Sequence, residues 1–239
     1  MRVQHRLGGF LGLVALFGFT GCGKLPGRPT PADIVLKPSA VRDFAVIYGQ
    51  NCAGCHGQDG RGNCSLALNN PEYLAIANDD VIRQVISRGT PGTMMPAFAS
   101  QAGGTLTNEQ IEVLVHEIRA RWGSAGILQS RFRPAYASSE EGDPARGVLT
   151  YGQFCESCHG SEGKGTSRAG QICDPTFLAL VSDQSLRTTI IAGRPDLGHP
   201  NWRTCSPDRP MTGRDVTDVV AWLSGKRSRF PGSDQPDRK

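Results

Sequence analysis

A five-residue pattern occurs twice in this chain: two cysteines separated by two residues, with a histidine directly after the second. The first copy comprises Cys52, Cys55 and His56, and the second comprises Cys155, Cys158 and His159. The spacing lets each pair of thiols form thioethers with the two vinyl groups of one haem, and it places the imidazole on the iron. A zinc site needs a second pair of ligands at suitable spacing, and a redox-active Cys-x-x-Cys pair needs no adjoining histidine. The repeated pattern therefore predicts two covalently attached c-type haems.

Length and composition fit two small domains built around such cofactors. The 239 residues suffice for two domains of ordinary small size. Aromatic residues make up only 7% of the chain, whereas glycine and proline number 30 and 16, so few large apolar side chains are available for a core. A large apolar cofactor in each domain would supply the missing core. The formal charge is only +4 and no basic stripe with interleaved aromatic residues occurs, so nucleic-acid binding is not expected.

The N-terminus has the features of an export signal. Arg2 and Arg6 precede an apolar run over residues 10–19, which is too short for a membrane span. The run ends at Gly21-Cys22 and resembles the lipobox of bacterial lipoproteins, although Phe19 stands where leucine is usual. The resemblance implies a signal peptide over residues 1–21, a lipid on Cys22 and a location on the periplasmic side of a bacterial membrane. The alternative is an ordinary or uncleaved signal with an incidental cysteine.

An internal repeat sets the architecture. Shifted by 104 positions, residues 70–98 lie on residues 174–202 without a gap, and the haem motifs match at a shift of 103. An amphipathic helix with apolar residues at i, i+3, i+4 and i+7 follows in each half. Its apolar positions are Ile111, Leu114, Val115 and Ile118 in the first half and Val216, Val219, Val220 and Leu223 in the second. We therefore expect a duplicated domain, not a solenoid of short repeats.

The repeat predicts the domain boundaries. A proline-rich tether over residues 22–38 leads to a first domain at 39–122, whose first helix is expected at about 39–48. Residues 123–142 lack helical periodicity and are predicted to be a linker. Asp143-Pro144 then restarts the pattern with an N-cap and a proline at the first helical position, so the second domain is expected at 143–226, followed by a polar tail at 227–239.

A haem iron in an electron carrier usually takes a sixth ligand, which is commonly methionine or histidine. In the first half an aperiodic loop contains Met94 and Met95. Here the chain resembles class I cytochromes c, in which a methionine followed by proline, on a loop before the last helix, is the sixth ligand. Met95 precedes Pro96 and fits this pattern, whereas Met94 lacks the proline. The alternative is that both methionines only fill the core.

The second half departs from that pattern. The position that matches Met95 is His199, which also precedes a proline. This match predicts that His159 and His199 both bind the second iron. Met211 is the rival ligand, but it aligns with Leu106 at the start of the last helix, where a core residue is expected. An open sixth position is the third possibility.

Three cysteines remain after four are assigned to haem and one to lipid, namely Cys64, Cys173 and Cys205. An odd number in an exported chain is consistent with one disulfide and one spare thiol. Cys173 and Cys205 bracket the loop that carries His199, so a disulfide between them is predicted. The alternative is three free or buried thiols.

Over residues 40–225 the chain resembles two-domain, diheme class I c-type cytochromes of bacteria. The resemblance implies an all-α fold of two tandem domains, each wrapped around a covalent haem, and electron transfer between redox proteins as the function. Because an axial methionine raises the reduction potential relative to a second histidine, the first haem is expected to be the higher-potential centre. Two other functions stay open: a diheme peroxidase-type enzyme and a fixed electron-transfer subunit of an oxidoreductase complex.

Overall fold

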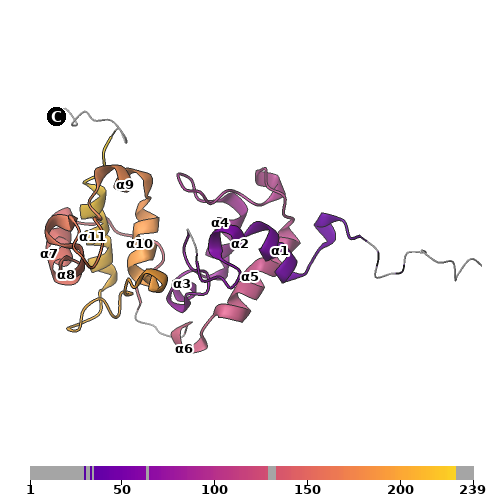
Figure 1. Cartoon of the computed structure of the whole chain (residues 1–239), viewed down its shortest axis with the longest axis horizontal. Helices are drawn as coiled ribbons and strands as arrows, with labels where there is room; N and C mark the ends of the chain where they lie inside the picture. Colours follow the sequence, from indigo (N-terminus) through magenta and orange to yellow (C-terminus); the bar gives the residue numbers. More distant parts are fainter. Residues whose placement is uncertain (1–29, 31–32, 34, 63–64, 129–132, 230–239) are drawn as a thin grey trace, which may run out of the picture. The chain divides into compact units, whose positions relative to one another are not determined.

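The computed structural model describes residues 30, 33, 35–62, 65–128 and 133–229. By its contacts the chain divides into residues 1–36 and a compact unit of residues 37–239, which contains both Cys-x-x-Cys-His motifs. The regular structure of this compact unit is helical, with isolated β-bridges at Ala99–Leu106 and Arg194–His199 (Figure 1). The all-α fold class is therefore confirmed. Cys22 and Cys64 lie outside the described residues.

In the first half, short helices surround the long helix α5. The short helices are α1 (Phe44–Asn51), α2 (Ala53–His56), α3 (Pro71–Ile76) and α4 (Asp79–Arg88), and α5 spans Asn108–Trp122. The predicted apolar stripe of α5 is buried, and Thr107 and Gln110 form a capping box at its start. The first helix begins later than predicted. The Asp43 side chain accepts from the Val46 N–H and caps α1 there, and residues Pro38–Ala40 form a separate 3₁₀ turn (η2).

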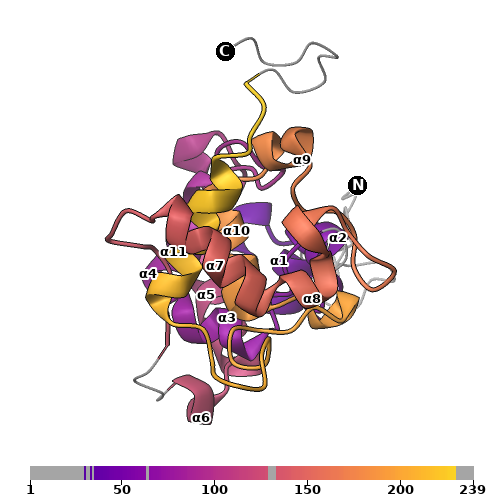
Figure 2. The ribbon, with the colours of Figure 1, turned by 90° about the vertical axis from the view of Figure 1, so that its left-hand side faces the viewer.

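The second half repeats this arrangement around α11. Its helices are α7 (Pro144–Phe154), α8 (Glu156–His159), α9 (Pro175–Leu180), α10 (Asp183–Ala192) and α11 (Gly213–Ser224). As predicted, Asp143 caps α7 and Pro144 is its first residue. Helix α7 packs against α11, and the two helices are neighbours in both views (Figures 1 and 2). Gly147 makes this close approach possible, because a Cβ there would lie 2.2 Å from the Asp218 carbonyl oxygen.

Both halves use an arginine to hold the end of the short helix after the haem motif. Arg119 of α5 donates to the Leu74 and Ala77 carbonyls at the end of α3 and pairs with Asp79. Arg227, which follows α11, donates in the same way to the Leu178 and Val181 carbonyls of α9 and pairs with Asp183. These bonds satisfy carbonyls that a helix end leaves unpaired. The two arginines come from different positions relative to the last helix, so the repeated contact is not visible in the sequence.

The described part of the segment predicted as a linker packs against both halves. It contains a short helix, α6 (Ala125–Leu128), and the side chain of Tyr136 packs against both hydrophobic cores. Arg187, only 5% exposed, donates to the carbonyls of Ala135 and Tyr136, and Gln184 also donates to Tyr136. Residues 135–136 therefore form part of the packed structure.

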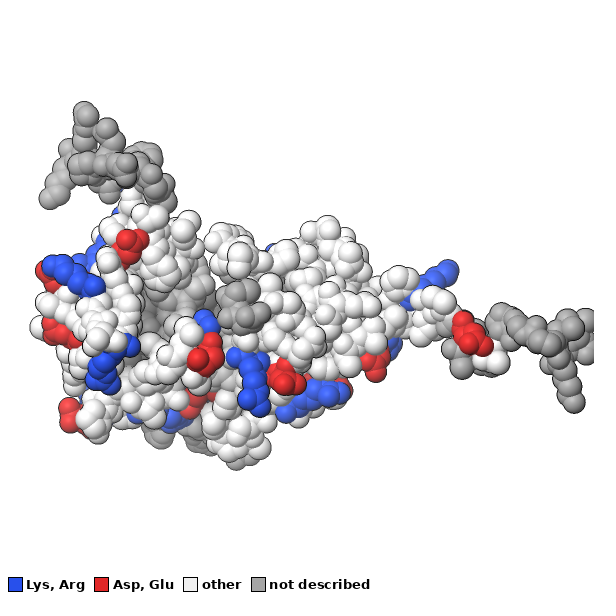
Figure 3. Space-filling view, in the orientation of Figure 1, with Lys and Arg blue, Asp and Glu red and all other residues white. Residues whose placement is uncertain are grey.

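Basic and acidic side chains are interspersed on the face shown in Figure 3. Ion pairs also join neighbouring helices, such as Arg83 of α4 with Glu112 of α5. Among the described residues, no helix is long and apolar enough to cross a membrane.

Candidate haem-binding sites

The two Cys-x-x-Cys-His motifs have the same backbone conformation. In each, the first cysteine ends one helix and starts a one-turn helix, α2 or α8, that ends at the histidine. A tyrosine fixes the turn that follows: the Tyr48 hydroxyl donates to the Gly57 carbonyl at 2.8 Å, and the Tyr151 hydroxyl donates to the Gly160 carbonyl at 2.5 Å. The two tyrosines lie 103 positions apart, as the motifs do, and this shared spacing is the signal by which the sequence could have identified them.

The two motif histidines are oriented for metal binding by backbone carbonyls. His56 Nδ1 lies 2.8 Å from the Leu66 carbonyl oxygen, and His159 Nδ1 lies 3.1 Å from that of Gly170. A carbonyl only accepts, so Nδ1 carries the proton and Nε2 keeps the lone pair that a metal needs. Burial lowers the pKa of His56, which also favours the neutral imidazole. Both residues therefore fit the role of an axial ligand through Nε2.

The first cysteine of each motif is unsuited to thiolate chemistry. Burial, with a further contribution from neighbouring thiols, raises the pKa of Cys52 and of Cys155 to about 12. A redox-active Cys-x-x-Cys pair needs a lowered thiol pKa, because the thiolate is the nucleophile. Both thiols pack against the apolar cores of their halves, which is an environment suited to a covalently held apolar macrocycle.

The first half presents one of its two candidate methionines towards the core. Met95 packs against the first hydrophobic core, whereas the Met94 side chain is 76% exposed. The loop folds tightly on the end of α4, since the Thr90 N–H donates to the Met95 carbonyl at 3.0 Å. Gly89 has a φ of +69°, and a Cβ there would lie 2.6 Å from the same carbonyl oxygen. This arrangement favours Met95 over Met94 as the sixth ligand.

The second half brings two histidine rings close together, with their planes inclined by 46°. The ring centroids of His159 and His199 lie 6.0 Å apart. Imidazole nitrogens bind first-row metals at about 2 Å, and each ring centre lies about 1 Å behind its nitrogen, so two rings on one metal stand about 6 Å apart. His199 Nδ1 is buried without a hydrogen-bond partner. Burial and the neighbouring His159 lower the pKa of His199, which favours the neutral form. The pair fits one iron between the rings.

Met211 occupies a different environment. It is 2% exposed within the second hydrophobic core, and its N–H donates to the Trp202 carbonyl at 2.9 Å. Leu106 holds the same place in the first half, where its N–H donates to the Phe98 carbonyl at 2.8 Å. The structure thus gives Met211 the role of a core residue before the last helix, which favours His199 as the ligand.

The predicted Cys173–Cys205 disulfide is not formed in the structure, where both residues carry free thiols. Both side chains pack against the second hydrophobic core, and each contributes to the raised pKa of Cys155. They therefore both lie near Cys155. The disulfide stays a prediction.

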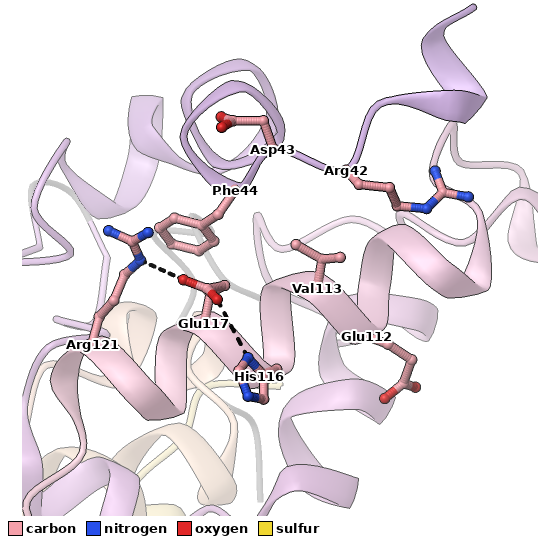
Figure 4. Close-up of a pocket in the computed structure, with 8 residues that line it drawn as sticks. All are labelled: Arg42, Asp43, Phe44, Glu112, Val113, His116, Glu117 and Arg121. Carbon is pink, nitrogen blue, oxygen red and sulfur yellow. Dashed lines mark hydrogen bonds and ion pairs between the residues drawn. The ribbon is translucent and has the colours of Figure 1, made fainter.

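A surface pocket of about 490 Å³ has no residue of either haem motif in its lining (Figure 4). It lies between the start of α1 and α5, and Glu117 at its centre pairs with His116 and Arg121. The lining residues are Arg42, Asp43, Phe44, Glu112, Val113, His116, Glu117 and Arg121. None of them is a predicted haem ligand.

Comparison with known proteins places both halves in one family. The family model described as "Cytochrome C oxidase, cbb3-type, subunit III" matches residues 39–116 and 142–223. The chain is 29% identical over 154 residues to the cbb3-type cytochrome c oxidase subunit CcoP of Azospirillum sp., covering 58% of this chain and 47% of that protein. It is also 29% identical over 182 residues to the subunit FixP of Bradyrhizobium diazoefficiens, covering 70% of this chain and 58% of that protein.

The chain thus spans about half the length of these curated relatives. Among solved structures it is similar to cytochrome cL of Methylophaga aminisulfidivorans, with 25% identity, a TM-score of 0.31, and coverage of 41% of this chain and 70% of that one. The match in two segments confirms two tandem cytochrome c domains, and it confirms the resemblance to diheme class I c-type cytochromes.

Proposed function

Since this chain belongs to the family of cbb3-type cytochrome c oxidase subunit III, we propose that it is an electron-transfer subunit that passes single electrons to an oxidase of that type. Its cofactors are two covalently bound haem c groups, and electron transfer is its role. The observation that carries the proposal is the family match over both halves of the chain. Of the functions left open by the sequence, this favours a subunit of an oxidase complex over a mobile carrier.

The ligands proposed for the two irons differ. His56 and Met95 hold the first iron, while His159 and His199 hold the second. The haems supply one-electron redox chemistry. The chain would supply the ligands, a carbonyl that keeps the proton on Nδ1 of each motif histidine, and an apolar core against the first cysteine of each motif. Two strong ligands on each iron leave no site for peroxide, which argues against the peroxidase alternative.

The order of the reduction potentials follows from these ligands. A methionine ligand raises the potential relative to a second histidine, so the first haem is the higher-potential centre. Transfer of an electron from the second haem to the first would then be thermodynamically favourable. Redox titration with spectra assigned to each haem tests this order, and a higher potential at the His199 haem would contradict it.

We also propose that the chain is exported and attached to a membrane by a lipid on Cys22, with its haem domains on the periplasmic side. Arg2, Arg6 and the apolar run support export, and Gly21-Cys22 supports lipid attachment. Metabolic labelling with a fatty acid tests the anchor. The label is expected on the native chain and absent from Cys22→Ser, whereas equal labelling of the two would contradict it.

The assembly with an oxidase is tested by purification from the native host. We expect an affinity-tagged full chain to co-purify with a cbb3-type cytochrome c oxidase and to show two covalent haems per chain. A variant with Cys52 and Cys55 both changed to alanine is the matched control for haem-dependent assembly. Recovery of the two-haem chain alone from gently solubilised membranes would contradict a subunit role.

A further inference from the structure

Helix α3 of the first half, with its N-cap, forms hydrogen bonds to both ends of the loop that carries His199 in the second half. We call residues 193–201, which contain His199, the axial loop. It starts directly after Ala192, the last residue of α10, and it ends directly before Trp202. Contacts from α3 and its N-cap reach the chain at both of these ends.

At the start of the loop, the Asn70 side chain has two tasks. Its Oδ1 accepts from the N–H groups of Glu72 and Tyr73 and caps α3. Its Nδ2 donates to the Ala192 carbonyl at 2.9 Å, 122 residues further along the chain. Asn70 is 5% exposed, so this bond is shielded from water. The cap of a helix in one half therefore fixes the backbone where the axial loop of the other half begins.

At the end of the loop, the Glu72 carboxylate takes two donors. Oε2 accepts from the Trp202 indole N–H at 3.1 Å, and Oε1 accepts from Nε of Arg203 at 3.0 Å. The Arg203 guanidinium also stacks on the Trp202 ring, with its carbon 4.3 Å from the ring centroid. Glu72 is 6% exposed, and a carboxylate so buried is stable only while its oxygens are paired. The three side chains thus act as one unit.

Backbone hydrogen bonds within the loop link its two ends to His199. Its ends are joined because the Trp202 N–H donates to the Ile191 carbonyl at 3.2 Å. Within it, Arg194 and His199 exchange backbone hydrogen bonds of 3.1 and 3.0 Å. Gly193 leaves room for the closure, since a Cβ there would lie 2.8 Å from the His199 carbonyl oxygen. A displacement of Trp202 or Ala192 would therefore move the His199 backbone.

At the matching positions, the second half lacks a counterpart of Glu72 and the first half lacks counterparts of its partners. The repeat places Thr176 where the first half has Glu72, and it places Phe98 and Ala99 where the second half has Trp202 and Arg203. Phe98 and Ala99 have no side-chain hydrogen-bond donor. The loop that carries Met95 therefore lacks the groups with which a counterpart of Glu72 could pair.

We propose that Asn70 and Glu72 are positioning residues for the second haem: from the first domain, they hold the axial loop so that His199 stays opposite His159. The proposal rests on the proposed ligation by His199. Its consequence is that the second haem keeps six ligands only while the two domains stay docked through α3. Separation of the two domains would then also weaken the binding of His199 to the lower-potential haem.

Glu72→Gln in the full two-haem chain tests the proposal, because it keeps the shape of the side chain and removes the charge that pairs with Arg203. We expect carbon monoxide to bind the reduced second haem roughly tenfold faster or more, as expected from the loss of a charged hydrogen bond. The electron paramagnetic resonance signal of that haem should change, and the signal of the first haem should not. Thr176→Val, at the matching exposed position, is the control and should change neither.

Trp202→Phe is the second variant, since it removes one N–H and installs the residue that the first half has at this place. It should speed carbon monoxide binding at the second haem in the same way, and combining it with Glu72→Gln should add little, because both break one contact. Native carbon monoxide rates in both folded single variants would overturn the positioning role. A native chain whose second haem is methionine-ligated would instead overturn the proposed ligation, so the two failures are distinguishable.

Discussion

The two halves of the molecule share the attachment of haem and differ in what opposes it. Their motif histidines donate to backbone carbonyls in the same way, and their motif tyrosines bind the same turn. In the proposed ligation, the first half offers Met95 on a loop that packs on its own domain, and the second offers His199 on a loop that also contacts the first domain. The two halves thus share the contacts around the haem motif, and they differ in the residue proposed to oppose the motif histidine and in the contacts that hold it.

The largest change in reduction potential is expected when both irons have two histidine ligands. Met95→His should lower the potential of the first haem by on the order of 0.1 V, because it exchanges a methionine ligand for a second histidine. Spectroelectrochemical titration would then show two centres of similar potential. Met94→His, at the exposed neighbouring position, is the control and should leave both potentials in place. A shift with Met94→His alone would show that the wrong methionine is assigned.

Removing His199 should leave the second haem with five ligands and the first haem with six. His199→Ala is expected to turn the second haem high-spin and to let it bind carbon monoxide, since Met211 is buried in the core and does not replace the lost ligand. Absorption and resonance Raman spectra report the spin state. Met211→Leu is the matched control: it installs the residue of the first half, should keep both haems low-spin, and should cost less than about 1.5 kcal/mol of stability. A high-spin haem in Met211→Leu would reverse the assignment.

Two glycines test what the halves have in common. Gly89→Ala and Gly193→Ala each place a Cβ against a loop carbonyl, at φ values of +69° and +72°. Each should lower the free energy of unfolding by about 3 kcal/mol, since the conformation is unfavourable for alanine and the loop must also move. Denaturant unfolding of the haem-loaded chain measures the loss. Gly92→Ala, at a positive φ but with open space, should cost less, and an equal cost would show that contact with the loop is unimportant.

Acid should weaken the second half before the first. Burial opposes ionisation of Asp218, but hydrogen bonds from Arg146 and from the Asp143 N–H, together with the Arg214 charge, lower its pKa below the usual value. The stability from this carboxylate is therefore present above its unfolded pKa of about 4 and is lost as pH falls through the lowered value.

The matching position in the first half is Val113, which carries no charge. Asp218→Asn should cost about 2 kcal/mol at neutral pH and should remove this part of the acid sensitivity. Acid unfolding from pH 6 downwards, followed by the absorption of each haem, measures the acid sensitivity of the two halves. Equal acid lability of both halves in the native chain would contradict this prediction.

The sequence predicts the parts of the fold that depend on local pattern. The Cys-x-x-Cys-His motifs, the capped helices and the apolar stripe of α5 follow from spacing, and the repeat predicts that His199 and Met95 are equivalent. Contacts between distant residues are not predictable in this way. Glu72 has no acidic counterpart in the second half, and its partners lie 130 and 131 residues away. Likewise, residues 123–142 lack periodicity, yet Tyr136 packs against both cores, because a tertiary contact needs no repeat.

The difference between the two irons is measured most directly by low-temperature electron paramagnetic resonance, combined with near-infrared magnetic circular dichroism, on the oxidised two-haem chain. The charge-transfer band of a methionine–iron bond distinguishes the two kinds of site. One methionine-ligated haem and one bis-histidine haem in equal amounts is the expected result. Two methionine-ligated haems would contradict the assignment of His199 and would make Met211 the sixth ligand of the second iron.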